Sequence, residues 1–384
     1  MNADHAKKVS IKNVIQFSGA FVAFFVGAAF GSGQEIMQFF TSFGIFGFPG
    51  LIAALLIFIF AGYQIQAVSC REGFSEPYSI FEYFCGKTIG KIYTYILVAM
   101  LYAEFVMMSA GAGATFEEYF GIPNFVGRAV IVILTVATVL LGLNRIVDML
   151  GFTGPVIILF MAIIGIASII MAPMTLKEGM ETAVTLDMLK GADTWVVSGL
   201  KYASYVVLSL VPIWAVCGSR SNSIKEARLS SVTQVLLFSI ACFVIILAQL
   251  MNVKLIDGTE IPNLVLARTY VPAIAGGFAI IILLGIYSTV TFELWYTVRK
   301  FSEEKTKRYY TLTIVLAAIG LFFSGLLPFS TIINWLYSAA YILGVILLIF
   351  MAVHMVGRWM GIDISAKLNP TKDEETKLKE GEHQ

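Results

Sequence analysis

Apolar windows long enough to cross a bilayer recur along the chain, and they constrain its fold more than any other feature. Runs such as Leu51–Phe60, Ala129–Leu141 and Phe238–Leu250 lie inside longer apolar windows, close to the ~20 residues that a spanning helix needs. Only 13% of the 384 residues are charged, against about 25% in an ordinary soluble domain. The alternating pattern of an outer-membrane barrel is absent. The sequence therefore predicts an all-α integral membrane protein.

Glycine, proline and charged residues divide the apolar windows into ten predicted helices. The expected spans are residues 12–40, 45–68, 88–114, 123–143, 146–172, 194–217, 228–252, 273–298, 310–327 and 331–357. They form a single transmembrane domain over residues 1–360. A cytoplasmic polar tail follows over residues 361–384, because it has too little apolar surface to bury.

The basic residues predict how these helices are oriented. With the N-terminus inside, most of the 26 Lys and Arg residues fall in cytoplasmic connections and tails, as the positive-inside rule requires. We expect a multi-pass protein of a bacterial plasma membrane with both termini cytoplasmic. The formal net charge of +1 does not suggest a nucleic-acid partner. The four cysteines have no metal spacing, so neither a metal nor a disulfide is expected.

Ten helices divide into two sets of five, and this division suggests an inverted repeat. A unit with an odd number of helices must insert upside down when it is repeated, which is the logic of secondary transporters. Helix one would then correspond to helix six, which contains Val211-Pro212. The sequence predicts a 5+5 inverted repeat in which helices one and six are broken near the middle of the membrane.

The stretch VGAAFGSGQEIMQFF in the first span contains Gly27, Gly31 and Gly33, followed by Glu35. Backbone groups freed in hydrocarbon cost several kcal/mol each unless they face protein, water or a ligand. The glycines therefore predict either a break that lines a cavity or close helix packing, since Gly27 and Gly31 also have small-xxx-small spacing. Glu35 is a candidate gating or coupling residue, or a charge favoured by the helix dipole.

Two short motifs resemble a known superfamily. Gly27–Gln34 resembles the unwound first-helix motif of the sodium-coupled neurotransmitter and amino-acid symporters, and Gly285–Thr289 resembles their small-x-x-hydroxyl-hydroxyl motif. With its GSGQE segment, the chain is similar to the YkvI-type bacterial membrane proteins of the amino acid-polyamine-organocation superfamily, which has the leucine-transporter fold. The family's usual Arg-Phe-Pro after the break is replaced by Met37–Phe40, so its arginine gate does not carry over.

The resemblance implies a sodium site, and no other cofactor is expected. The implied ligands are the carbonyls of Gly27, Phe30 and Gly285 and the hydroxyls of Ser288 and Thr289. Neutral oxygens suit a monovalent cation. Helix five lacks the lysine that replaces this sodium in some proton-coupled relatives. Alternatively, the two hydroxyls bond back to the preceding helical turn.

The predicted solute site combines the first-helix break with polar residues of helices three and six. The candidate residues are Ala29, Gly31, Ser32, Gly33, Tyr102, Glu104, Ser204 and Tyr205. The resemblance aligns Tyr102 with a phenol that touches the substrate carboxylate. Glu104 is a proton or coupling site, a partner for a cationic solute, or a protonated packing residue. Glu293 is expected nearer the cytoplasmic end of helix eight, where a functional role is as plausible as pairing with Arg299 or solvation at the interface. An ion pair is expected between Asp148 and Arg145.

These features favour a secondary active transporter of a small solute such as an amino acid or amine. Sodium-coupled symport by alternating access is the first expectation. A proton-coupled transporter, or a nutrient-sensing receptor or channel on the same fold, is the alternative. An enzyme is not expected, because His5 and His383 lie in the tails and His354 lies near the end of the last helix. The expected partners are the solute and the lipid bilayer.

Overall fold

The computed structural model describes residues 8–25, 28–74, 78–141 and 146–368, and the regular elements in these residues are helices. Each of the ten expected spans has a counterpart. The first span comprises three short helices, α1 (Ile11–Phe25), α2 (Ala28–Ser32) and α3 (Gln34–Phe39). The others are α4 (Gly47–Glu72), α5 (Ser79–Phe120), α6 (Asn124–Leu141), α7 (Ile146–Ile170), α9 (Trp195–Ser219), α10 (Ile224–Met251), α13 (Pro272–Phe301), α14 (Lys307–Phe323) and α15 (Phe329–Trp359).

Shorter helices lie in the connections between these spans. They are the 3-10 helix η2 (Thr41–Phe46), α8 (Leu176–Ala183), α11 (Val253–Ile256), α12 (Pro262–Tyr270) and α16 (Ile364–Leu368). Seven helices of the described chain are long and apolar enough to cross a membrane: α4 together with η2, α5, α6, α9, α10, α13 and α15. The remaining three spans are the broken first segment, α7 and the shorter α14. The all-α membrane architecture is therefore confirmed.

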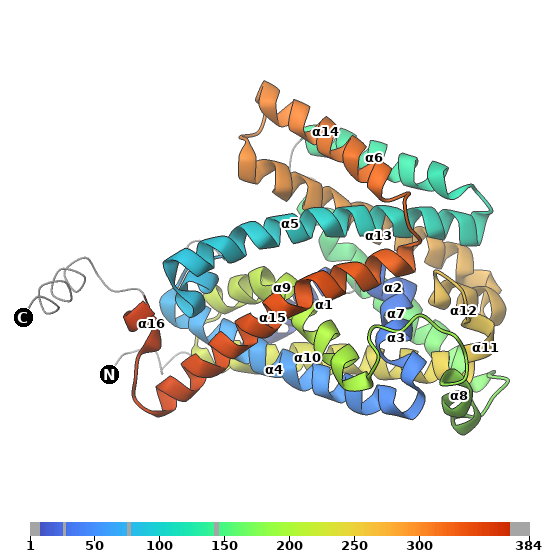
Figure 1. Cartoon of the computed structure of the whole chain (residues 1–384), viewed down its shortest axis with the longest axis horizontal. Coiled ribbons are helices and arrows are strands. Elements are labelled where there is room, and N and C mark those ends of the chain that lie inside the picture. The colour runs from blue at the N-terminus through green and yellow to red at the C-terminus, as the bar shows by residue number, and fades with distance from the viewer. Residues whose placement is uncertain (1–7, 26–27, 75–77, 142–145, 369–384) are drawn as a thin grey trace, which may run out of the picture.

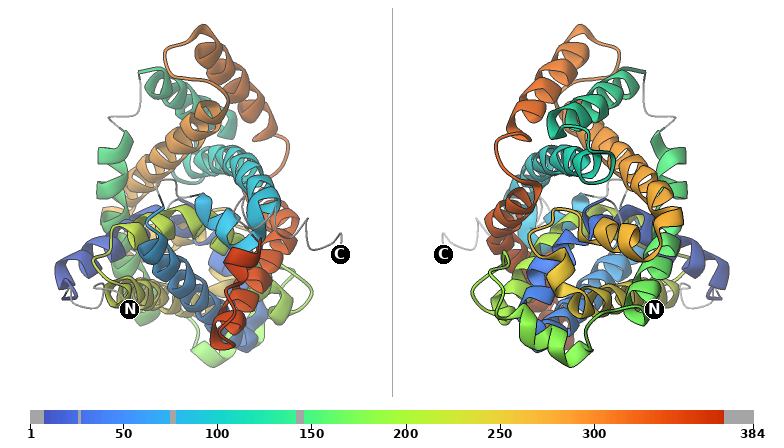
Figure 2. Two further views of the ribbon diagram at one scale, coloured as in Figure 1. Left: turned by 90° about the vertical axis from the view of Figure 1, so that its left-hand side faces the viewer. Right: turned by 90° about the vertical axis from the view of Figure 1, so that its right-hand side faces the viewer.

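The helices form a bundle with the broken first segment inside it. Helices α5 and α13 cross the molecule side by side, and α6 and α14 form a separate pair at one edge (Figures 1 and 2). Helix α4 packs against α9 and α10 on the opposite part of the bundle. Large apolar side chains of the edge pair, such as Ile133 and Phe322, are 65% exposed. Such surfaces suit contact with lipid tails rather than water.

The first helix is interrupted at Gly33, which adopts a left-handed backbone conformation with φ of 83°. A Cβ atom at this position would lie 2.4 Å from Asn263 Oδ1, so both the backbone and the available space require glycine. The prediction that glycines break this helix is correct. Small residues therefore let α2 and α3 meet at the centre of the bundle.

Helix six differs from the expectation. Helix α9 runs from Trp195 to Ser219 with Pro212 inside it, so the predicted break is wrong at the level of the helix assignment. One proline removes a single backbone donor, and no glycine lies between Gly199 and Gly218 to release the backbone further. Neighbouring groups in a membrane bundle can satisfy one freed carbonyl. The helix therefore continues through the proline.

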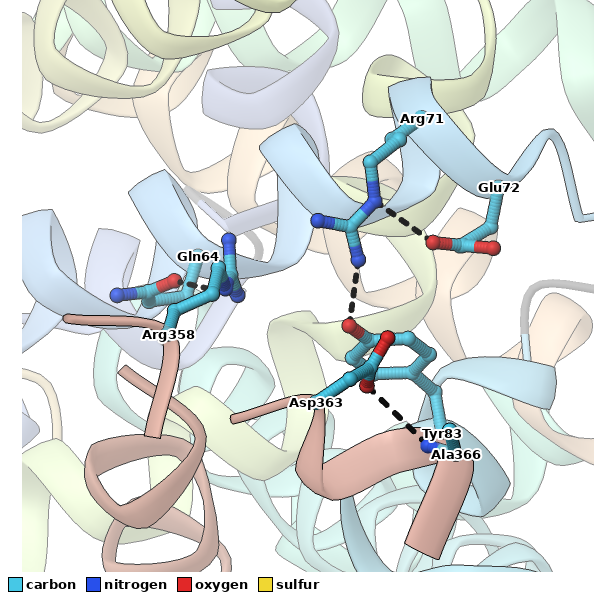
Figure 3. A network of polar contacts seen from close by, with 7 residues as sticks. All are labelled: Gln64, Arg71, Glu72, Tyr83, Arg358, Asp363 and Ala366. Carbon is cyan, nitrogen blue, oxygen red and sulfur yellow. Dashed lines mark hydrogen bonds and ion pairs between the residues drawn. The ribbon is translucent and has the colours of Figure 1, made fainter. Parts of the chain in front are cut away.

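A polar network joins the ends of α4, α5 and α15 on the predicted cytoplasmic side (Figure 3). Arg71 donates to Glu72 Oε1 at 2.7 Å and to the Tyr83 hydroxyl at 2.5 Å. Arg358 donates to Gln64 Oε1 at 3.3 Å. Asp363 accepts the amide N–H of Ala366 in α16 at 3.2 Å. The first part of the predicted polar tail thus belongs to the folded body.

Candidate functional site

The carbonyl groups freed at the first-helix break bind buried amide side chains. Asn263 Nδ2 of α12 donates to the Gly31 carbonyl at 3.1 Å, and Gln249 Nε2 of α10 donates to the Gly33 carbonyl at 2.8 Å. Thr41 Oγ1 in turn donates to Gln249 Oε1 at 2.7 Å. These amide side chains supply hydrogen-bond donors to backbone carbonyls that would otherwise be unpaired inside the membrane. The break is present, and these two carbonyls face protein donors.

The remaining predicted residues of the break form local hydrogen bonds or lie outside the described structure. The Phe30 carbonyl accepts the Gly33 N–H at 3.0 Å, and Ser32 Oγ accepts the Gln34 N–H at 3.1 Å. Gly27 lies outside the described residues, as does the side chain of Ala29. The solute and ion roles assigned to these residues stay predictions.

The two motifs predicted to hold sodium lie on helices that pack together, α2 and α13. A Cβ atom at Gly31 or Gly285 would lie 3.5 or 3.0 Å from side-chain atoms of Ile157, so both glycines face the same residue of α7. Ser288 Oγ donates to the Gly285 carbonyl at 2.8 Å, as in the back-bonding alternative. Thr289 is half-buried on the same helix. Two of the predicted oxygen ligands are therefore adjacent.

Three carboxyl groups from distant parts of the sequence lie inside the bundle; we call them the acidic cluster. Glu35 of α3 is 4% exposed and Glu293 of α13 is 3% exposed, whereas Glu104 of α5 keeps part of its side chain accessible. None of the four ion pairs found in the described chain involves these glutamates. An intramembrane carboxyl without a basic partner is expensive and indicates function.

Hydrogen bonds connect the acidic cluster to helices α9 and α15. Tyr337 donates its hydroxyl to Glu35 Oε1 at 2.6 Å. Tyr205 and Ser209 both donate to Glu104 Oε1, the serine at 2.7 Å. The rings of Tyr205 and Tyr337 stack with their centroids 3.8 Å apart. A continuous path of contacts therefore runs from Glu35 to Glu104.

The carboxyl groups of Glu104 and Glu293 lie close enough to interact electrostatically. Glu293 Oε2 has no hydrogen-bond partner among the described residues. Of the alternatives for Glu293, solvation and pairing with Arg299 are wrong, because the side chain is 3% exposed and Arg299 lies 3.9 Å from Glu304 instead. Helix α13 continues to Phe301, more than two turns beyond Glu293, and this length keeps the carboxyl inside the bundle.

Aromatic rings form a wall around Glu35, which we call the aromatic wall: Phe39, Phe40, Tyr202, Tyr205 and Tyr337. Phe39 packs on Tyr337 with ring centroids 4.8 Å apart, and Phe40 meets Tyr202 edge-on at 5.0 Å. Tyr202 and Tyr337 stack at 5.9 Å. The faces of such rings attract cations. The arrangement combines a carboxyl with several ring faces.

Two predicted solute residues lie apart from the acidic cluster. Tyr102 donates its hydroxyl to the Leu316 carbonyl of α14 at 2.9 Å, so its phenol points toward α14. Ser204 is buried where α9 meets Gly344 of α15, since a Cβ atom at Gly344 would lie 2.2 Å from the Ser204 carbonyl oxygen. Asp148 and Arg145 cannot be placed as a pair, because the side chain of the first and the whole of the second lie outside the described residues.

Sequence reasoning missed Gln249, Asn263 and Tyr337, and it gave Ser209 no preference. The two amides pair with glycine carbonyls more than 200 positions away. An intramembrane position marks Gln249 and Tyr337 as polar residues inside predicted spans, whereas Asn263 lies in a predicted connection and has no such signal. That signal selects many residues, and the contacts single out these four.

Comparisons with known proteins identify relatives of unassigned function. No known family model matches the sequence. The uncharacterized protein YyaD of Bacillus subtilis is 26% identical over 219 residues, which are 57% of this chain and 61% of the relative. The uncharacterized membrane protein YkvI of the same organism is 30% identical over 149 residues, 39% of this chain and 43% of YkvI. The matches thus span less than two thirds of either relative.

Solved structures establish the fold. The crystal structure of MhsT in complex with L-phenylalanine matches with a TM-score of 0.56 and 15% identity, covering 91% of this chain and 89% of MhsT. The inward-facing conformation of Mhp1 matches with a TM-score of 0.54 and 16% identity, covering 90% of this chain and 76% of Mhp1. The chain is therefore similar to YkvI over part of that protein's length, and it has the same fold as MhsT and Mhp1.

Proposed function

We propose that this protein is a proton-coupled secondary transporter of a small organic solute that carries an amine. The observation that carries this proposal is the set of hydrogen bonds from stacked Tyr337 and Tyr205 to Glu35 and Glu104, beside the buried Glu293, with no basic partner for the three carboxyls in the described chain. We assign the proton to the carboxyl pair of Glu104 and Glu293 and the solute's amine to Glu35 and the aromatic wall. The likeness to MhsT and Mhp1 supports alternating access only through the shared fold.

Two carboxyl groups in contact away from water cannot both carry a negative charge at an acceptable cost, so they share protons as a pair. Tyr205 and Ser209 both donate to Glu104, and such donors stabilise a negative charge there. A proton of the pair is then best placed on Glu293. The pair can hold one proton or two, and a coupled carrier needs two such states.

Glu35 is suited to an ammonium group. Its carboxyl accepts one hydrogen bond from Tyr337 and has no basic partner in the described chain. A ring of the aromatic wall that turns its face to a bound amine would add cation–π attraction, which is worth about 2 kcal/mol or more at a desolvated site. An amine can therefore bind here by charge and by ring contact together.

The stacked rings of Tyr205 and Tyr337 connect the two sites. Each phenol donates to one carboxyl, Tyr337 to Glu35 and Tyr205 to Glu104. A solute that shifts the Tyr337 ring as it binds Glu35 must also shift Tyr205, and with it the donor that favours charge on Glu104. Solute binding at Glu35 then changes the proton affinity of the carboxyl pair, and proton binding changes the solute affinity by the same free energy. Coupled transport requires such a coupling free energy.

Sodium coupling is the second candidate. It is favoured by the adjacent Gly285 carbonyl and Ser288 hydroxyl oxygens, 2.8 Å apart on the helix that packs against α2. In this case Ser288→Ala should lower the affinity for sodium about tenfold, because a hydrogen bond or ligand contact of this kind is worth roughly 1.5 kcal/mol. Under the proton proposal, uptake in potassium buffer equals uptake in sodium buffer.

Reconstituted vesicles test the proposal. The protein is placed in liposomes that contain a pH-sensitive dye, and a panel of radiolabelled amino acids and amines is supplied with and without an inward proton gradient. We expect an amine-bearing solute to accumulate with the gradient and to acidify the lumen in potassium buffer. Accumulation that requires sodium and ignores the proton gradient would refute proton coupling, and saturable binding without any accumulation would indicate a receptor.

A further inference from the structure

A buried arginine lies at the predicted outer end of the bundle, away from the acidic cluster. Arg128 of α6 is 9% exposed and forms no ion pair or hydrogen bond with the described residues, and its Nε atom is fully buried. Among the described residues, the guanidinium makes a cation–π contact with the ring of Phe125, whose centroid lies 5.8 Å from the guanidinium carbon. The terminal nitrogens are not among the fully buried unpaired atoms, so the guanidinium opens to the adjoining cavity, where an anion can pair with it.

Two glycines make room for this side chain. A Cβ atom at Gly113 of α5 would lie 2.7 Å from Arg128 Cγ. One at Gly325, in the α14–α15 connection, would lie 2.0 Å from Arg128 Nη1. Real Cβ contacts are not this short, so any larger residue at either place would displace the arginine. The position of the guanidinium therefore depends on glycine in α5 and in the α14–α15 connection.

Arg128 lines a cavity of about 390 Å³ between the end of α5, the start of α6 and the segment before α15. Asn124 and Ser324 add polar groups, and Glu117 and Glu260 add two carboxyls. Glu260 is held by Ser330, whose N–H and hydroxyl donate to its two oxygens at 2.7 and 2.9 Å. The cavity therefore presents one unpaired cation and two anions.

We propose that this outer cavity is a separate binding site for a small zwitterionic amino acid, whose carboxylate pairs with Arg128. A planar guanidinium binds a carboxylate through two parallel hydrogen bonds, the strongest common pairing for this side chain. The ammonium group of the same solute lies toward Glu117 and Glu260. This site shares no residue with the acidic cluster, and it does not depend on the proposed transport function.

The test uses binding rather than transport. The purified full-length protein is treated with phenylglyoxal, which modifies accessible arginine side chains, and modification of Arg128 is followed by peptide mass spectrometry. Glycine, acetate and ethylamine are the probes. We expect glycine to protect Arg128 most, acetate less and ethylamine not at all. Equal modification with and without glycine would overturn the proposal, and this readout needs no variant.

Variants add a second measurement. We expect Arg128→Gln to weaken glycine binding, followed by thermal shift, at least about tenfold, since a charge-assisted pair is lost. Glu104→Gln should leave glycine protection of Arg128 intact, which separates this site from the acidic cluster. A phospholipid phosphate is the rival anion. Native mass spectrometry that finds a phospholipid lost only in Arg128→Gln, together with no effect of glycine, would assign the cavity to lipid and overturn the proposal.

Discussion

The variant Glu104→Gln tests the shared proton directly. Two unit charges 4 Å apart repel by about 4 kcal/mol at an effective dielectric constant of about 20. At about 1.4 kcal/mol per factor of ten, the doubly charged pair is disfavoured about a thousandfold. The wild-type pair, whose carboxyls lie close together, therefore keeps one proton on Glu293 through the cycle and exchanges a second one at Glu104. Glutamine in place of Glu104 keeps an acceptor oxygen for Tyr205 and Ser209 but has no exchangeable charge.

We expect Glu104→Gln to fold and to bind solute, while solute-driven acidification of the vesicle lumen falls to the leak rate. The dye assay measures this, with solute exchange across the membrane at equal pH as the parallel readout. Glu303→Gln, which changes an exposed carboxyl beyond the end of α13, is the control and should behave like wild type. Undiminished proton movement in Glu104→Gln would refute the reasoning.

Two further predictions concern the break and the aromatic wall. Gly33→Ala should lower the thermal unfolding temperature and the expression yield, because a positive φ costs about 1 kcal/mol or more for alanine and the new Cβ would overlap Asn263; an unchanged melting curve would contradict this. Tyr337→Phe should weaken amine binding about tenfold by removing the donor to Glu35. Tyr341→Phe, one turn later on α15, is the control, and equal affinities of the two variants would exclude the assigned role.

The sequence predicted helices well because spanning segments follow a local rule, and a window of apolar residues is sufficient to recognise each of them. The break at Gly33 was predictable for the same reason, since left-handed backbone favours glycine locally. Contacts between side chains of different helices were not predictable in this way. The Glu104–Glu293 contact joins α5 to α13, and their linear positions suggested only that one lies deep and the other near a helix end.

Proline and amide residues show where a local rule fails. Pro212 predicted a break in α9, but its effect depended on whether nearby glycines released more backbone, and none did. Gln249 lies near the end of a predicted helix and Asn263 in a predicted connection, and their role appears only when the folded chain brings Gly31 and Gly33 against them. Long-range hydrogen bonds of this kind leave no periodic pattern.

The amide groups that cap the first-helix break make water a participant in opening. If α12 moves away from the bundle, Asn263 leaves the Gly31 carbonyl, and a shift of α10 would free the Gly33 carbonyl in the same way. An unmet buried carbonyl costs about 1–3 kcal/mol, whereas a water molecule that replaces the amide restores most of that loss. Movement of α10 or α12 away from the break and hydration of the break must therefore occur together. Without water at the break, the closed conformation is favoured.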